Sequence, residues 1–199
     1  MFHYKNLEIF TPKSVYCPRE DSILMADVIS TLSKAELKKV LEIGCGSGFL
    51  SILSTNLGAT VTAVDINSDA ITTTLKNANR NNIKLTAFQS DLFENVKGKF
   101  DLIFFNPPYL PNIASEESIE GNETWADNGV IEHFIKQVNN YLNPNGMVLL
   151  LISSLTQTPA LELLEKAGFS TETIAKKKIP WEELSIIKAT PTRDQTKAI

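Results

Sequence analysis

The sequence predicts an open α/β sheet in which most strands run parallel. Three observations support this class: short apolar runs alternate with amphipathic stretches, most runs end in a glycine or a polar residue, and the chain has no internal repeat. The 199 residues, 43% of them apolar, suit one globular domain. We expect residues 1–38 to form an N-terminal extension that contains a helix, residues 39–190 to form the core and residues 191–199 to form a polar tail.

Seven segments have the composition of strands. Two of them flank Ile179-Pro180 and are expected to pair in antiparallel fashion, and the other five cover residues 39–43, 60–65, 84–89, 100–105 and 147–152. The segment 100–105 is nearly all apolar, which is typical of a strand buried on both faces. The arrangement predicts a doubly wound, mostly parallel sheet that ends in an antiparallel pair.

Apolar residues at helical spacing predict helices between these strands. Asn67 or Ser68 is expected to cap one of them, the segment Asn143 to Gly146 to stop another, and Gly168 to follow a third. The predicted helices cover residues 20–34, 49 to about 57, 68 to about 81, 131–142 and 160–167. Residues 190–199 are expected to fray.

Composition argues against several classes of protein. The 19 Lys+Arg and 23 Asp+Glu give a net charge of −4, so the chain lacks the global basic field of many nucleic-acid-binding proteins. Its two cysteines, Cys17 and Cys45, form no CxxC pair or Cys/His cluster, so we expect neither a disulfide framework nor a metal site. No stretch approaches the ~20 apolar residues of a membrane span, and the N-terminus lacks a signal-peptide layout. We therefore expect a cytoplasmic protein.

Polar residues and glycines stand at or just beyond the carboxyl ends of successive strands. In open α/β sheets, ligands bind at that edge. Folding should therefore gather five residues into one site: Glu42, Gly44, Asp65, Asp91 and Asn106.

A glycine loop follows the first strand of the core. Gly44, Gly46 and Gly48 form G-x-G-x-G, and Phe49 stands where a nicotinamide-binding loop has its third glycine. Glu42 suits a cationic group better than a pyrophosphate, and S-adenosylmethionine has such a cation. A tight strand-to-helix turn is the structural alternative.

Acidic residues follow the next two strands. Asp65 can accept hydrogen bonds from both hydroxyls of an adenosine ribose. Asp91 can accept a hydrogen bond from an adenine amino group, and Leu92 can pack on the adenine ring. The alternatives are an acid that stabilises the N-terminus of a helix for Asp65 and a solvated turn for Asp91-Leu92.

The tetrapeptide Asn106-Pro107-Pro108-Tyr109 follows the most apolar strand. The Asn106 side-chain oxygen and the Pro107 carbonyl can accept both hydrogens of a planar NH₂ group, and Tyr109 can stack on its plane. Pro107 and Pro108 fix φ and bring no competing N–H. The pattern predicts a pocket for an sp² amine or amide, with a proline-rich turn as the alternative.

These motifs together resemble class I S-adenosylmethionine-dependent methyltransferases of the HemK-like kind, which methylate the glutamine amide in the Gly-Gly-Gln motif of translation termination factors. The resemblance implies a Rossmann-like, seven-stranded sheet with an antiparallel C-terminal strand. It also implies protein-glutamine N5-methylation, with Asn106, Pro107 and Tyr109 as catalytic residues. The resemblance rests on Glu42 to Gly48, Asp65, Asp91-Leu92 and Asn106 to Tyr109, and it spans most of the chain.

Two further segments, 15–22 and 183–185, resemble the short eukaryotic and archaeal branch of that family. Family members use the upstream segment to close over the cofactor, which implies supporting roles for Tyr16 and Ser22. The alternatives are a packed aromatic side chain and a helix cap. About 38 residues precede the first core strand, too few for the bacterial domain that grips the release factor. The resemblance implies a heterodimer with a small zinc-binding activator protein.

Two other functions stay open. The same pocket would accept the exocyclic amine of adenine or guanine in DNA or RNA, and an idle partner subunit would keep the fold without the activity. The only basic cluster, Lys176 to Lys178, is explained by a solvated edge strand. Four acidic residues beside the pocket would repel a phosphate backbone: Glu116, Glu117, Glu120 and Glu123.

Overall fold

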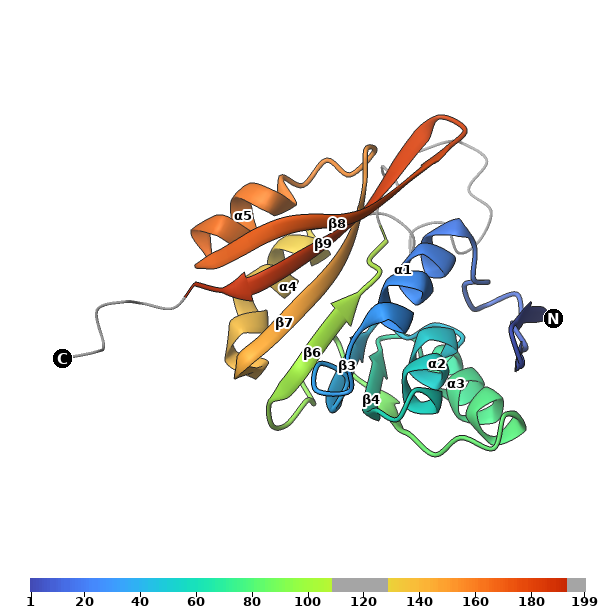
Figure 1. Cartoon of the computed structure of the whole chain (residues 1–199). Helices are drawn as coiled ribbons and strands as arrows, with labels where there is room; N and C mark the ends of the chain where they lie inside the picture. Colours follow the sequence, from blue (N-terminus) through green and yellow to red (C-terminus); the bar gives the residue numbers. More distant parts are fainter. Residues whose placement is uncertain (109–128, 193–199) are drawn as a thin grey trace.

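A computed structural model describes residues 1–108 and 129–192, and its centre is one seven-stranded sheet (Figure 1). The strand order is β5-β4-β3-β6-β7-β9-β8. The last strand, β9 (Glu182–Pro191), is antiparallel to β7 and to β8 (Phe169–Ile179). The parallel strands are β3 (Lys39–Ile43), β4 (Thr60–Asp65), β5 (Thr86–Gln89), β6 (Phe100–Phe105) and β7 (Leu142–Ser153). The predicted fold class is confirmed.

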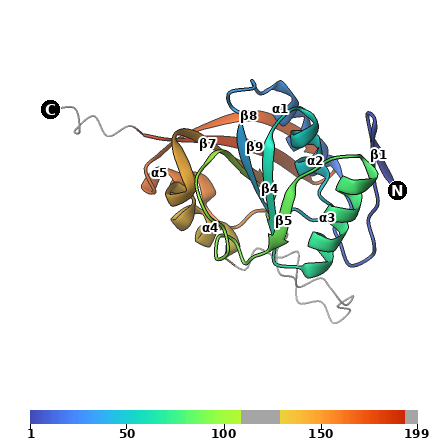
Figure 2. The same cartoon turned by 90° about the horizontal axis from the view of Figure 1, so that it is seen from below.

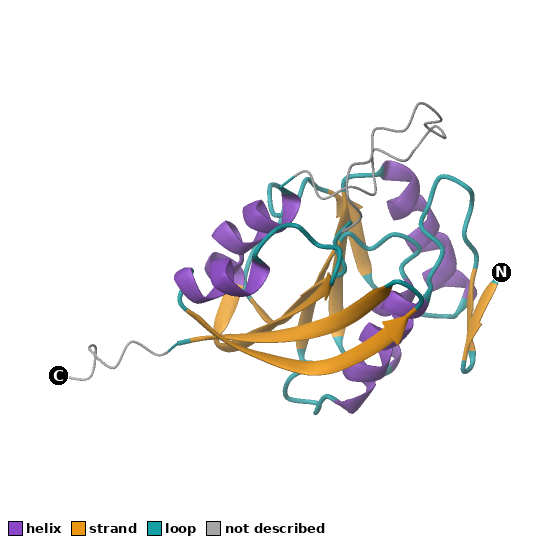
Figure 3. Cartoon of the chain, turned by 90° about the horizontal axis from the view of Figure 1, so that it is seen from above, coloured by secondary structure: helices purple, strands orange, loops and turns teal. Residues whose placement is uncertain are grey.

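Helices cover both faces of the sheet (Figure 3). One face packs on α1 (Glu20–Thr31) and α2 (Phe49–Asn56), with α3 (Ser68–Arg80) beside them, and the other on α4 (Val130–Val138) and α5 (Ala160–Lys166). Alternation along β6 shows why two cores form. Leu102 and Phe104 enter the first core, and Ile103 and Phe105 enter the second.

Several predicted boundaries differ from the observed ones. The first helix ends at Thr31, β5 begins at Thr86, and Thr190 and Pro191 belong to β9 and not to a frayed tail. The prediction that a helix runs to 142 is also wrong, because α4 ends at Val138 and continues only as a short 3₁₀ turn over Asn139–Tyr141.

The segment Asn143 to Gly146 lies within β7 and not before it. Leu142 already pairs with Phe100, and the register then shifts before Leu102 pairs with Met147. The turn-forming residues therefore make an irregularity inside the strand, which sequence patterning cannot distinguish from a loop.

An N-terminal hairpin was not predicted. It consists of β1 (Phe2–Tyr4) and β2 (Leu7–Ile9), and it lies beside α2 and α3 (Figure 2). Leu7 and Ile9 are buried in the first core, and the ring of Phe2 meets that of Phe49 edge-on at 5.0 Å between centroids. Each strand has three residues, too few to show an alternating pattern.

Among the helices that the structure describes, none combines the length and apolar character that crossing a membrane requires.

Candidate active site

The carboxyl ends of the parallel strands open onto a cavity of about 760 Å³. The structure brings together at its wall all the predicted site residues that it describes: Tyr16, Ser22, Glu42, Gly44, Gly46, Asp65, Asp91, Leu92, Asn106, Pro107 and Pro108. Tyr109 lies outside the described residues. The cavity therefore spans the sheet edge at which the strand-end residues were expected to meet.

The glycine loop turns sharply between β3 and α2. Gly48 has a φ of +78°, and a Cβ there would stand 2.7 Å from the Thr74 side chain, so the loop packs too closely on α3 for a larger residue. Gly46, at a φ of +52°, faces the cavity side, and a Cβ there would have no described atom within 4 Å. A ligand can therefore approach the backbone at Gly46.

Asp65 ends β4 and faces the glycine loop. Its Oδ2 accepts a hydrogen bond from the Gly46 N–H at 2.8 Å, and its Oδ1 accepts one from the Asn67 N–H at 2.9 Å. Asn67, one of the two predicted caps, caps α3 by accepting from the Asp69 N–H at 2.9 Å. Each Asp65 oxygen keeps acceptor capacity toward the cavity.

Glu42 is a buried carboxyl in the wall of the cavity. The Ser51 hydroxyl donates a hydrogen bond to its Oε2, and burial raises the pKa of Glu42 to about 8. Burial likewise raises the pKa of Asp65. Among the described residues no lysine or arginine forms an ion pair with either group. The cavity thus favours a ligand that brings its own positive charge.

The turn after β5 presents Asp91 and Leu92 to the cavity. Asp91 is exposed, and Leu92 is half-buried with a φ of +45°, which is unusual for a leucine. The Ser90 hydroxyl holds this turn, because it donates to the Leu92 carbonyl at 3.1 Å and accepts from the Asn95 N–H at 3.0 Å. The backbone strain is therefore balanced by local hydrogen bonds.

Asn106 has a fixed orientation. Its Nδ2 donates to Asp21 Oδ2 at 2.9 Å, while its Oδ1 is buried and accepts no hydrogen bond from any residue that the structure describes. A buried amide oxygen without a donor is costly unless a ligand supplies one. The arrangement presents an acceptor for an N–H group of the ligand.

Asp21 is the site residue that the sequence predictions missed. It is buried in the first turn of α1, where an acid is expected merely to complement the helix dipole. Besides Asn106, its Oδ2 accepts from the Tyr16 hydroxyl at 2.9 Å, and its Oδ1 accepts from the Ser22 N–H at 2.6 Å. The available signal was that Asp21 lies in the segment 15–22, which resembles the short branch of the HemK-like family. Ser22 is not a helix cap, because Arg19 occupies the N-cap position.

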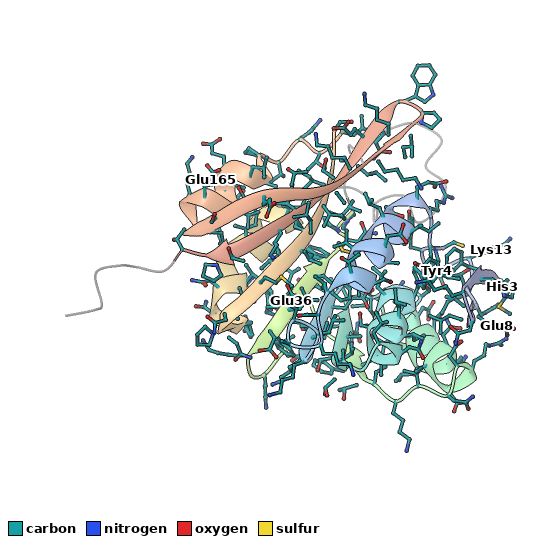
Figure 4. All side chains as sticks on the ribbon, viewed as in Figure 1. His3, Tyr4, Glu8, Lys13, Glu36 and Glu165 are labelled. Atoms are coloured by element: carbon teal, nitrogen blue, oxygen red, sulfur yellow. The ribbon has the colours of Figure 1, made fainter. Side chains whose placement is uncertain are left out.

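Residues 8–16, the N-terminal strap, begin within β2 of the hairpin and run across α3 to this site. Asn81 accepts from the Glu8 N–H at 3.0 Å and donates to the Glu8 carbonyl at 2.8 Å. Asn77 makes the same pair of bonds to Phe10 and also donates to the Ser47 carbonyl of the glycine loop at 2.9 Å. Glu8 and Lys13 lie on the side of the hairpin, far from Glu165 on α5 (Figure 4).

Comparisons with known proteins identify the family. Residues 6–179 match the family described as methyltransferase small domain. A Methanocaldococcus jannaschii protein named protein N5-glutamine methyltransferase is 43% identical over 183 residues, which cover 88% of this chain and 91% of the relative. The human methyltransferase HEMK2 is 33% identical over 195 residues, which cover 88% of this chain and 89% of the relative.

Solved structures share the fold. The structure of the E. cuniculi Mtq2-Trm112 complex, which is described as responsible for methylation of the termination factor eRF1, has a TM-score of 0.65 and 24% identity, covering 90% of this chain and 99% of that chain. The resemblance to HemK-like methyltransferases that the motifs predicted is confirmed. The chain belongs to the methyltransferase small domain family.

Proposed function

We propose that this methyltransferase transfers a methyl group from S-adenosylmethionine to the glutamine side-chain amide in the Gly-Gly-Gln motif of a translation termination factor. The observation that supports this most strongly is the orientation of Asn106, whose Oδ1 is buried without a donor among the described residues while Asp21 fixes its Nδ2. Such an acceptor suits the N–H group of a planar amide. Two of the relatives reported above, the Methanocaldococcus jannaschii protein N5-glutamine methyltransferase and human HEMK2, also favour this activity.

The cavity suits S-adenosylmethionine. We propose that Asp65 binds the ribose hydroxyls and that Asp91 and Leu92 bind the adenine. Gly44 and Gly46 would let the ligand come close to the backbone, and Glu42 would face the cationic part of the ligand. Tyr16 and Ser22 have a supporting role, because both bond to Asp21 at the same wall. When bound, S-adenosylmethionine supplies a methyl group attached to a positively charged sulfur. A correctly placed nitrogen can accept this methyl group directly.

An amide nitrogen is a poor nucleophile because its lone pair is delocalised. The enzyme therefore has to hold the amide in place and stabilise the positive charge that develops on its nitrogen until that nitrogen releases one of its two protons to water. We assign this to the Asn106 oxygen and the Pro107 carbonyl as acceptors. Pro108 fixes its own φ and brings no competing N–H, and Tyr109 is proposed to stack on the amide plane.

We also propose a small zinc-binding activator protein as the partner subunit. The proposal rests on the resemblance to the short branch of the HemK-like family. The Mtq2-Trm112 complex, whose Mtq2 chain has this fold, makes a subunit of the Trm112 kind the natural protein to add in reconstitution.

Binding of the cofactor should strengthen as pH rises toward 8. Burial raises the pKa of Glu42 to about 8, so at neutral pH most of the free enzyme holds a protonated Glu42 that must lose its proton to pair with a cation. The Kd for S-adenosylmethionine should therefore fall by up to about tenfold per pH unit below 8 and level off above it. Calorimetric titration from pH 6 to 9 measures this.

Glu42→Gln is the control for that titration. It should weaken binding at pH 8 and remove most of the slope, and an unchanged slope would exclude Glu42 as its source. Without cofactor, a carboxyl with a raised pKa favours the folded state only while protonated, so wild-type stability should fall as pH rises from about 4.5 to 8. The variant should lose this dependence, which thermal unfolding measures.

Asn77→Ala should raise the Kd for S-adenosylmethionine by about fivefold to tenfold, the value of one or two hydrogen bonds. Asn77 is buried and joins the strap to the Ser47 carbonyl of the glycine loop. Asn81→Ala is a matched control, because Asn81 makes the same pair of bonds to the strap at Glu8. The described hydrogen bonds of Asn81 do not include the glycine loop, so the Kd of Asn81→Ala for S-adenosylmethionine should change less than twofold. Equal weakening in both variants would contradict the role of Asn77.

The substrate can be tested with purified components. The enzyme, its partner subunit and S-adenosylmethionine are incubated with a purified termination factor, and the product is mapped by mass spectrometry. The proposal expects one added methyl group on the glutamine of Gly-Gly-Gln and none when that glutamine is replaced by glutamate. Methyl transfer to DNA or RNA, with an unmodified factor, would replace this proposal with the nucleic-acid function.

A further inference from the structure

The end of the hairpin formed by β8 and β9 projects beyond the rest of the sheet (Figure 1). Ile179, Glu182 and Leu184 line the cavity from the hairpin, and Trp181 lies at its tip. We infer that Glu182 and Trp181 form a subsite that holds the main chain of the protein substrate next to the glutamine to be methylated. This inference rests on the proposed function and identifies the part of the enzyme that recognises a polypeptide.

Glu182 contributes an acceptor that lacks a donor. Its Oε1 is buried and has no hydrogen-bond partner within residues 1–108 and 129–192. The neighbouring Glu183 differs, since it forms an ion pair with Lys176 at 2.8 Å. Because successive side chains of a strand point to opposite faces, Glu183 faces away from the cavity that Glu182 lines. A peptide N–H donating to Glu182 would form a charge-assisted hydrogen bond.

Trp181 contributes an apolar surface at a position that favours a different residue. Pro180 and Trp181 connect Ile179 to its cross-strand partner Glu182, and Trp181 has a φ of +71°. Proline followed by a positive φ is typical of a type II turn, in which glycine or asparagine suits the second position. The positive φ costs backbone strain, and because Trp181 is 96% exposed, its indole leaves a large apolar surface in water.

The two features favour a polypeptide as the occupant. An exposed tryptophan gains free energy when a protein partner covers it, and tryptophan is prominent among residues that dominate such interfaces. The subsite is continuous with the cavity, because Glu182 belongs to both. A nucleic acid suits it less well, since the Glu182 carboxylate would repel phosphate groups.

The test compares four variants of the intact enzyme with its partner subunit. Trp181→Ala and Glu182→Gln should each raise the KM for the purified termination factor about tenfold, without changing kcat or the KM for S-adenosylmethionine. Trp181→Phe should restore most of the affinity, because an aromatic ring remains. Glu183→Gln, on the opposite face, should match the wild type. Thermal unfolding of each variant checks the fold.

Three outcomes would overturn the inference. An unchanged KM for the factor in both Trp181→Ala and Glu182→Gln would remove the subsite and leave the proposed function intact. A raised KM for S-adenosylmethionine in Glu182→Gln would assign Glu182 to the cofactor. If the wild-type enzyme methylates nucleic acid and not the factor, the proposed function and the subsite both fail.

Discussion

Asn106→Ala should lower kcat by about two to three decades while leaving the Kd for S-adenosylmethionine nearly unchanged. The reason is that the Asn106 oxygen, held by the Asp21 hydrogen bond at 2.9 Å, is assigned to the substrate amide and strengthens its bond as positive charge develops. Single-turnover kinetics at saturating cofactor separates this effect from binding. An equal loss of cofactor affinity would contradict the assignment.

Asp21→Asn gives a graded control for Asn106. The carboxylate of Asp21 accepts only, and this fixes which end of the Asn106 amide faces the cavity. An asparagine at position 21 can donate or accept, so the Asn106 amide loses its unique orientation. We expect the kcat of Asp21→Asn to lie between that of the wild type and that of Asn106→Ala, with little change in the Kd for the cofactor.

Asp65→Ala should have the opposite pattern and raise the Kd for S-adenosylmethionine by about two decades or more. Two hydrogen bonds from ribose hydroxyls to a carboxylate would be lost, each worth about 1.5–3 kcal/mol. The glycine loop would also lose its bond from Gly46. Isothermal titration measures the Kd, and kcat at saturating cofactor should fall much less.

Asp69→Ala is the matched control for Asp65. Asp69 is an exposed acid in the first turn of α3, so its removal tests the helix-dipole effect without touching the cavity. Its Kd for the cofactor should equal that of the wild type. If Asp65→Ala reduces only thermal stability and leaves the Kd unchanged, Asp65 serves the helix and not the ligand.

Sequence patterning predicted the strands that position the site. The bounds of β3, β4 and β6 match the predicted ones, because each is an apolar or β-branched run that stops at a glycine or a polar residue. Sequence patterning did not predict the short hairpin of β1 and β2 or the irregular start of β7, because neither has a periodic pattern of apolar residues.

The site residues at the strand ends were also accessible to sequence reasoning, since parallel strands place their carboxyl ends at one edge. Asp21 lies in the segment 15–22 that carried the resemblance, but its role was not predictable, because it depends on a contact with Asn106 across 85 positions of the chain. The contact of Asn77 with Ser47 escaped for the same reason, as it depends on how α3 packs against the glycine loop. Long-range hydrogen bonds of single side chains leave no local pattern in the sequence.

Glutamine methylation is tested most directly in an extract from the source organism, which supplies any partner subunit. The purified protein and tritiated S-adenosylmethionine are added, and the labelled material is digested with protease or with nuclease. If the enzyme methylates glutamine, protease alone should convert the label to small fragments, and the label should migrate with a termination factor. Label released by nuclease alone would contradict glutamine methylation, although the fold and the family would stand.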